Sequence, residues 1–136
     1  MTAAKPGDVL CLADGTYTEA IQPTTDGTAG APITVRALND GAVTIDGGGA
    51  RVPLLIYRNW WIVGGLVLRN GAVAVARVEG DSDVLRRVSA YDASTDTNSS
   101  LVFVWGDNNL IEDVVAAGTA RWGVEVYEGN GNTLRR

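Results

Sequence analysis

The sequence contains no histidine and only one cysteine among its 136 residues. Without histidine, the chain lacks Ser-His-Asp and Cys-His catalytic groups, imidazole metal sites and histidine pH switches. The lone Cys11 excludes an intramolecular disulfide and a zinc site built from several thiolates. Lysine is equally scarce, since Lys5 is the only one and the other basic residues are all arginine.

Basic charge and long apolar runs are also limited. Sixteen acidic residues against eleven basic ones give a net charge of −5, which disfavours a nucleic-acid partner. The longest uncharged apolar stretch, residues 60–68, is far shorter than the ~20 residues of a membrane span. The first six residues contain no apolar signal-peptide core. We therefore expect neither a nucleic-acid nor a membrane partner.

The composition indicates one folded domain over residues 1–136. Apolar residues make up 46% of the chain and charged residues 20%, which argues against disorder. The chain has 17 glycines, well above the average share of about 7%. Such a chain turns often.

An internal repeat is the strongest signal in the sequence. Four segments open with polar turn-forming residues and then become apolar: residues 59–66, 81–88, 107–114 and 129–136. Their matched positions are Ile62, Val84, Leu110 and Thr133, spaced by 22, 26 and 23 residues. An apolar strand precedes each turn, at residues 54–57, 73–78, 101–105 and 124–127.

This repeat predicts an all-β fold, a right-handed parallel β-helix of about five to six rungs. No helical stretch long enough to cross between parallel strands is present, so each strand must pair with its equivalent one rung away, about 4.8 Å off. The right hand is the general rule for parallel crossovers. An antiparallel sandwich or barrel is the alternative.

Three N-terminal segments carry a resemblance to a known family. They are Lys5-Pro6-Gly7-Asp8, Ala13-Asp14-Gly15-Thr16-Tyr17 and Gly27-Thr28-Ala29-Gly30-Ala31-Pro32-Ile33-Thr34. They resemble the first rungs of secreted right-handed parallel β-helix proteins, in particular the alginate lyase and chondroitinase B group of polysaccharide lyases. The resemblance implies an extracellular or periplasmic location.

Neither end of the chain carries a polar cap of the kind that closes a solenoid. We expect the chain to be the N-terminal portion of a longer β-helix, truncated at both ends. The uncapped C-terminal rung could also support end-to-end self-association.

The resemblance implies cleavage of a uronate-containing, acidic polysaccharide by β-elimination, with Ca²⁺ as a possible cofactor. A cation neutralises the uronate carboxylate, and a base then removes the neighbouring proton. The group's lysine, arginine and carboxylate residues are expected on later rungs, so no catalytic residue is assigned here. A non-catalytic scaffold for glycan binding or cell-surface structure is the alternative. Polygalacturonase-like hydrolysis is disfavoured, because it uses clustered aspartates with a histidine.

The candidate site lies on the strand that precedes each polar turn. Stacking the rungs by their turns predicts a column of Glu79, Trp105 and Glu128, with Tyr57 before them. Aromatic and basic side chains on or near this strip are the candidates for sugar binding: Trp105, Tyr57, Arg77, Trp122 and Arg121. Its carboxylates are the candidate metal ligands: Glu79, Glu125 and Glu128. The competing interpretation is a solvated face of Arg–Glu pairs with aromatic residues that serve packing.

Overall fold

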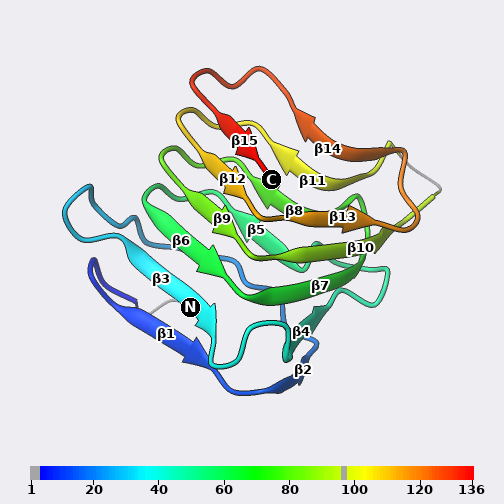
Figure 1. The fold of residues 1–136 in the computed structure, drawn as a ribbon, viewed down its shortest axis with the longest axis horizontal. Coiled ribbons are helices and arrows are strands. Elements are labelled where there is room, and N and C mark those ends of the chain that lie inside the picture. The colour runs from blue at the N-terminus through cyan, green and yellow to red at the C-terminus, as the bar shows by residue number, and fades with distance from the viewer. Residues whose placement is uncertain (1–3, 96–97) are drawn as a thin grey trace.

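The computed structural model describes residues 4–95 and 98–136, which form fifteen strands and no helix (Figure 1). Sheet A contains β1 (Val9–Leu12), β3 (Ile33–Ala37), β6 (Trp61–Gly64), β9 (Val84–Arg86), β12 (Leu110–Glu112) and β15 (Thr133–Arg135). Sheet B contains β2 (Gly15–Tyr17), β4 (Val43–Asp46), β7 (Leu66–Gly71), β10 (Ser89–Ala93) and β13 (Val115–Ala117). Sheet C contains β5 (Leu54–Ile56), β8 (Ala74–Val78), β11 (Ser100–Val104) and β14 (Trp122–Val126).

These three sheets form a parallel β-solenoid of about five turns, which confirms the predicted fold class. Every pairing between the named strands is parallel, and each strand pairs with its equivalent on the neighbouring turn. The register in sheet A aligns Ile62 with Val84, Val84 with Leu110, and Leu110 with Thr133. The spacings of 22, 26 and 23 residues are therefore the lengths of successive turns.

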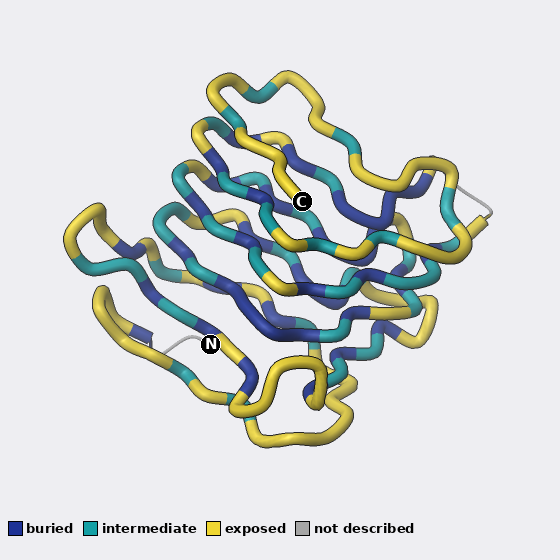
Figure 2. The backbone as a smooth tube through the Cα atoms, viewed as in Figure 1, coloured by how far each residue is buried: buried dark blue, intermediate teal, exposed yellow. Residues whose placement is uncertain are grey.

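Strand alternation fills the interior. In β3 and β4, every second side chain is buried, as the period of two predicts. The largest buried side chain is Trp61 at the start of β6, whose indole Nε1 donates to the carbonyl oxygen of Thr25. Figure 2 shows the buried residues concentrated in the middle turns and the exposed residues at the two ends.

The polar residues at the corner between sheets C and A have a structural role. The side-chain oxygens of Asp26, Asn59, Asp81 and Asp107 each accept the backbone N–H of the equivalent residue one turn later, ending at Asn130. Backbone N–H groups in a corner point along the solenoid axis and need such acceptors. This ladder explains why the repeats that begin at residues 59, 81 and 107 open with Asn or Asp.

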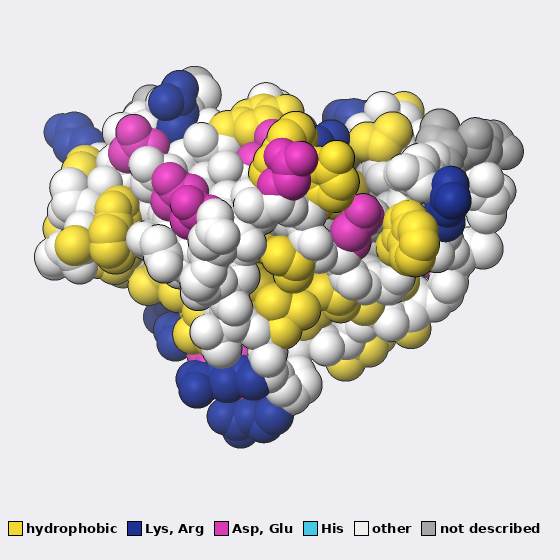
Figure 3. Space-filling model, turned by 90° about the horizontal axis from the view of Figure 1, so that it is seen from above, with side chains coloured by type: hydrophobic (Ala, Val, Ile, Leu, Met, Phe, Trp, Pro, Cys, Tyr) yellow, Lys and Arg dark blue, Asp and Glu magenta, His cyan; other side chains and the backbone are white. Residues whose placement is uncertain are grey.

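The last turn leaves apolar side chains exposed. Val124, Val126 and Leu134 are each more than two-fifths exposed. Figure 3 looks at this end of the solenoid and shows hydrophobic side chains across it, with a group of basic side chains at one edge. Among the residues described, there is no helix long and apolar enough to cross a membrane.

Candidate functional site

Two columns of outward-facing residues run across sheet C. The first contains Leu55, Arg77, Phe103 and Glu125, which the strand register places directly beside one another. The second follows the ends of the strands and contains Tyr57, Glu79, Trp105 and Tyr127. The backbone N–H groups of Glu79, Trp105 and Tyr127 donate to Ile56, Val78 and Val104, at the same point of each turn.

The predicted column was wrong in its last member, because Tyr127 and not Glu128 lies beside Trp105. Leu110 follows Val104 by six positions, but its partner Thr133 follows Val126, the partner of Val104, by seven. Glu128 is the additional residue, and it adopts a left-handed conformation with φ of 60°. A one-residue bulge of this kind shifts every position that was counted back from the following turn.

The register of β14 brings a third aromatic ring into the site. Tyr127 lies 5.6 Å from Trp105 between ring centroids, with the planes at 90°, and 6.2 Å from Phe103 in a stacked orientation. Phe103 and Trp105 meet edge to face at 6.0 Å. These separations are typical of favourable aromatic pairs. Trp105 and Tyr127 remain 43% and 48% exposed, so the cluster presents ring surface to solvent.

Arg77 lies beside this aromatic cluster. Its guanidinium carbon is 5.0 Å from the centre of the Phe103 ring, a cation–π distance. The same guanidinium forms an ion pair with Glu79, and both side chains are mostly buried. Arg77 is therefore held in place between an aromatic face and a carboxylate.

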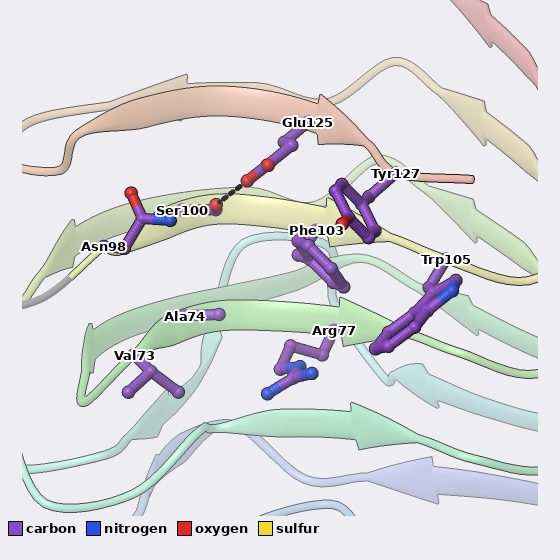
Figure 4. Close-up of a pocket in the computed structure, with 9 residues that line it drawn as sticks. All are labelled: Val73, Ala74, Arg77, Asn98, Ser100, Phe103, Trp105, Glu125 and Tyr127. Carbon is purple, nitrogen blue, oxygen red and sulfur yellow. Dashed lines mark hydrogen bonds between the residues drawn. The ribbon is translucent and has the colours of Figure 1, made fainter. Parts of the chain in front are cut away.

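A pocket of about 280 Å³ is formed where these groups meet (Figure 4). Ligand pockets in proteins start at roughly 300 Å³, so this one suits a small group such as one sugar ring. Across the pocket from Arg77, the Ser100 hydroxyl donates to a Glu125 carboxylate oxygen at 2.6 Å. The pocket is lined by Val73, Ala74, Arg77, Asn98, Ser100, Phe103, Trp105, Glu125 and Tyr127.

The predicted residues divide into two groups. Arg77, Trp105 and Glu125 line the pocket, whereas Tyr57, Trp122 and Arg121 do not. Tyr57 is exposed two turns before Trp105 in the second column.

Trp122 and Arg121 form a separate pair. The Arg121 guanidinium carbon is 5.4 Å from the centre of the Trp122 ring, and the Trp122 indole N–H donates to Asn98 Oδ1 at 3.3 Å. Both residues are exposed at the start of β14.

Sequence reasoning missed Phe103, Ser100 and Tyr127. Phe103 was available from alternation, because it lies two residues before Trp105 on the same strand. Tyr127 could have been found only by allowing for the extra residue at Glu128.

The carboxylates proposed as metal ligands do not form a metal site. Glu79 forms an ion pair with Arg77, and Glu125 accepts a hydrogen bond from Ser100. Glu128 forms the bulge and so lies outside the column. Residues 4–95 and 98–136 contain no group of three acidic, cysteine or histidine side chains that could hold a metal ion. Ca²⁺ prefers six to eight oxygen ligands, so these residues do not fit it.

A second, more open hollow of about 630 Å³ lies where sheet B leads into sheet C. Its carboxylates are engaged within the protein. Asn70 donates to both oxygens of Asp46, and the Thr119 backbone and hydroxyl donate to Asp92. These hydrogen bonds lower the pKa values of both Asp46 and Asp92. The ionised forms of both carboxylates in this hollow are therefore stabilised by the protein.

Comparison with known proteins identifies the family. Residues 1–95 match the family model of chondroitinase B. The chain belongs to the chondroitinase B family. No curated protein sequence matches it. The matched segment includes Arg77 but ends before Ser100, so the match covers one wall of the pocket and not its aromatic cluster.

Solved structures of polysaccharide lyases share the fold of this family member. An alginate lyase from Paenibacillus sp. str. FPU-7 has a TM-score of 0.73 at 21% identity, over 97% of this chain and 59% of its own. Pectate lyase Pel9A has a TM-score of 0.72 at 17% identity, over 97% of this chain and 39% of its own. Alginate lyase AlyGC has a TM-score of 0.67 at 26% identity, over 80% of this chain and 16% of its own. The chain thus spans less than two-thirds of each of these lyases.

Proposed function

We propose that the chain is the N-terminal part of a polysaccharide-active β-helix protein and that its sheet C pocket binds a uronate-containing polysaccharide. The carrying observation is the combination of Trp105, Tyr127 and Phe103 with Arg77 in one solvent-facing pocket. Exposed aromatic faces stack on the apolar faces of sugar rings, and a guanidinium recognises carboxylates. Membership of the chondroitinase B family supports a lyase as the parent activity.

In this proposal, the parent protein cleaves the polysaccharide by β-elimination. That reaction requires a base, and a cation to neutralise the uronate carboxylate. Arg77 could contact a uronate carboxylate, but its charge is balanced by Glu79, so it serves positioning better than proton transfer. The lyase chemistry therefore depends on residues outside those described here. We also propose an extracellular or periplasmic location, where such polysaccharides occur.

The second candidate is a non-catalytic scaffold for glycan binding or cell-surface structure. It is favoured by the absence of a metal-holding cluster in the described part of the chain. It is also favoured by the position of Lys5, which lies in the exposed N-terminal turn before β1 and not on sheet C.

Binding and turnover measurements separate these candidates. Calorimetric titration with oligouronates from alginate, pectate and chondroitin, and with a neutral oligosaccharide as the control, tests the pocket. Ultraviolet detection of unsaturated chain ends tests for elimination. Binding of uronates that is lost in Trp105→Ala but kept in Leu38→Ala, which removes an exposed side chain outside the pocket, supports the proposal. Equal binding by both variants would contradict the proposed binding site. Unsaturated product formed by this chain alone would contradict the non-catalytic scaffold.

A further inference from the structure

An interior ladder of side chains runs parallel to the outer one at the start of sheet A. It is formed by Asp83, Asn109 and Asn132, which occupy the same position on three successive turns. In each, Oδ1 accepts a backbone N–H from the preceding turn. The donors are Trp61 at 2.7 Å, Asp83 at 2.7 Å and Asn109 at 2.8 Å.

The two asparagines make a second bond with their other side-chain atom. Asn109 Nδ2 donates to the carbonyl oxygen of Gly80 at 2.9 Å, and Asn132 Nδ2 donates to that of Gly106 at 2.8 Å. The oxygen and the nitrogen of both amides thereby join neighbouring turns. Asn109 Nδ2 packs against Gly106, and Asn132 Nδ2 packs against Gly129. In both cases the accepting carbonyl belongs to the equivalent glycine one turn earlier.

Asp83 has equivalent surroundings, but it places the oxygen Oδ2 where the two asparagines place the nitrogen Nδ2. A Cβ added at Gly80 would lie 2.1 Å from the Arg58 carbonyl oxygen and 2.6 Å from Asp83 Oδ2. A Cβ added at Gly106 would likewise meet the Gly80 carbonyl oxygen and Asn109 Nδ2. Arg58 O is thus the carbonyl that Asp83 Oδ2 faces. Asp83 is 1% exposed, and its Oδ2 is buried without a hydrogen-bond partner among the described residues.

An ionised carboxylate is unfavourable in this position. It would place a buried negative oxygen towards a carbonyl oxygen, and both atoms are acceptors. A proton on Oδ2 converts the contact into a hydrogen bond equivalent to that of Asn109 and Asn132. We propose that Asp83 is a proton-dependent rung of this ladder, which as a neutral acid donates from Oδ2 to the Arg58 carbonyl and loosens that turn when it ionises.

The electrostatic surroundings agree with this assignment. Burial raises the pKa of Asp83 to about 8, and the negative charges of Asp81 and Asp26 act in the same direction. The bond from the Trp61 N–H opposes them without cancelling their effect. Asp83 is therefore protonated at neutral pH in the folded chain and ionised in the unfolded chain, so folding takes up one proton.

The sign of the pH dependence follows from this proton uptake. A carboxyl whose pKa is higher in the folded state contributes most stability below its unfolded pKa, near 3.8. That contribution decreases as the pH rises and is gone above about 8. Stability therefore changes across neutral pH in a chain that has no histidine.

Chemical unfolding of the wild-type chain and of Asp83→Asn, measured from pH 3.8 to about pH 8, tests the proposal. Between the unfolded and the folded pKa of Asp83, the unfolding equilibrium constant of the wild type divided by that of the variant should increase about tenfold per pH unit. At the alkaline end of the range, the variant should be the more stable of the two. Asp107→Asn is the matched control, because it alters the exposed ladder and should keep the wild-type slope. A constant ratio for Asp83→Asn would overturn the proposal.

A direct titration covers the case in which the variant does not fold. The side-chain carboxyl carbon of Asp83 in the wild-type chain can be followed by NMR after assignment through its own backbone. A midpoint near 8 supports the proton-dependent rung. A midpoint at or below 3.8 contradicts it, whatever the behaviour of the variants.

Discussion

Tyr127 packs edge to face against Trp105 on the neighbouring turn, with 5.6 Å between ring centroids. The pairing of Val126 with Val104 places Tyr127 there, and Glu128 is the extra residue that connects this register to the following turn. If Glu128 occupied the position of Trp105 and did not bulge, Tyr127 would fall at the position of Val104, and its side chain would point to the other face of the strand. The bulge at Glu128 thus accommodates the β14 register that completes an aromatic surface beside Arg77.

Removal of the Trp105 ring should affect binding more than folding. Trp105→Ala is expected to weaken oligouronate binding by at least about tenfold, or about 1.4 kcal/mol. The free energy of unfolding should fall by only about 1–2 kcal/mol, because a half-exposed ring loses two edge contacts. Calorimetric titration and denaturant unfolding measure the two effects. A large loss of stability with unchanged affinity would assign Trp105 to packing alone.

The bulge itself can be tested at Glu128. A non-glycine residue in the left-handed region is strained, so Glu128→Gly should raise the free energy of unfolding by about 0.5–1 kcal/mol. Deletion of Glu128 gives Val126 and Thr133 the same spacing as Val104 and Leu110, so Tyr127 should stay beside Trp105 and oligouronate binding should be kept. Denaturant unfolding and the same titration report these outcomes. A deletion variant that loses oligouronate binding would contradict the assignment of Glu128 as the extra residue.

The sequence predicted the solenoid well because its repeat is set by local chemistry. Each corner needs side-chain oxygens to receive backbone N–H groups, and this places Asn or Asp at a near-constant period that is visible without a structure. The column around Trp105 was predicted correctly on those turns that have the same number of residues between the sheet C strand and the following corner. It failed at Glu128, because the choice between a bulge and a shifted strand depends on the backbone pairing of β14. Paired charges such as Arg77 and Glu79 were predicted as separate ligands, since composition does not show which side chains meet.

Close packing between turns should make a corner glycine harder to replace than a glycine in an exposed strand. A Cβ at Gly106 would lie 1.8 Å from the Gly80 carbonyl oxygen, whereas a Cβ at Gly123 would meet nothing within 4 Å. Gly106→Ala should therefore destabilise the chain by about 1–3 kcal/mol or more, because the corner must shift. Gly123→Ala, in the exposed strand β14, should be neutral or slightly stabilising. Thermal unfolding of the two variants checks this, and equal effects would contradict the predicted packing of the corners.

Acid should act on the chain through Asp46. Hydrogen bonds from Asn70 and from the Gly48 backbone hold the pKa of Asp46 below its usual value of 3.8, with a smaller contribution from Arg69. A carboxyl whose pKa is lowered by folding contributes stability above its unfolded pKa, and that contribution is lost as the pH falls through the folded pKa. Asp46→Asn should therefore flatten the decline of the melting temperature below pH 3.8. An unaltered acid profile in Asp46→Asn would show that its bonds to Asn70 and Gly48 do not distinguish the two charge states.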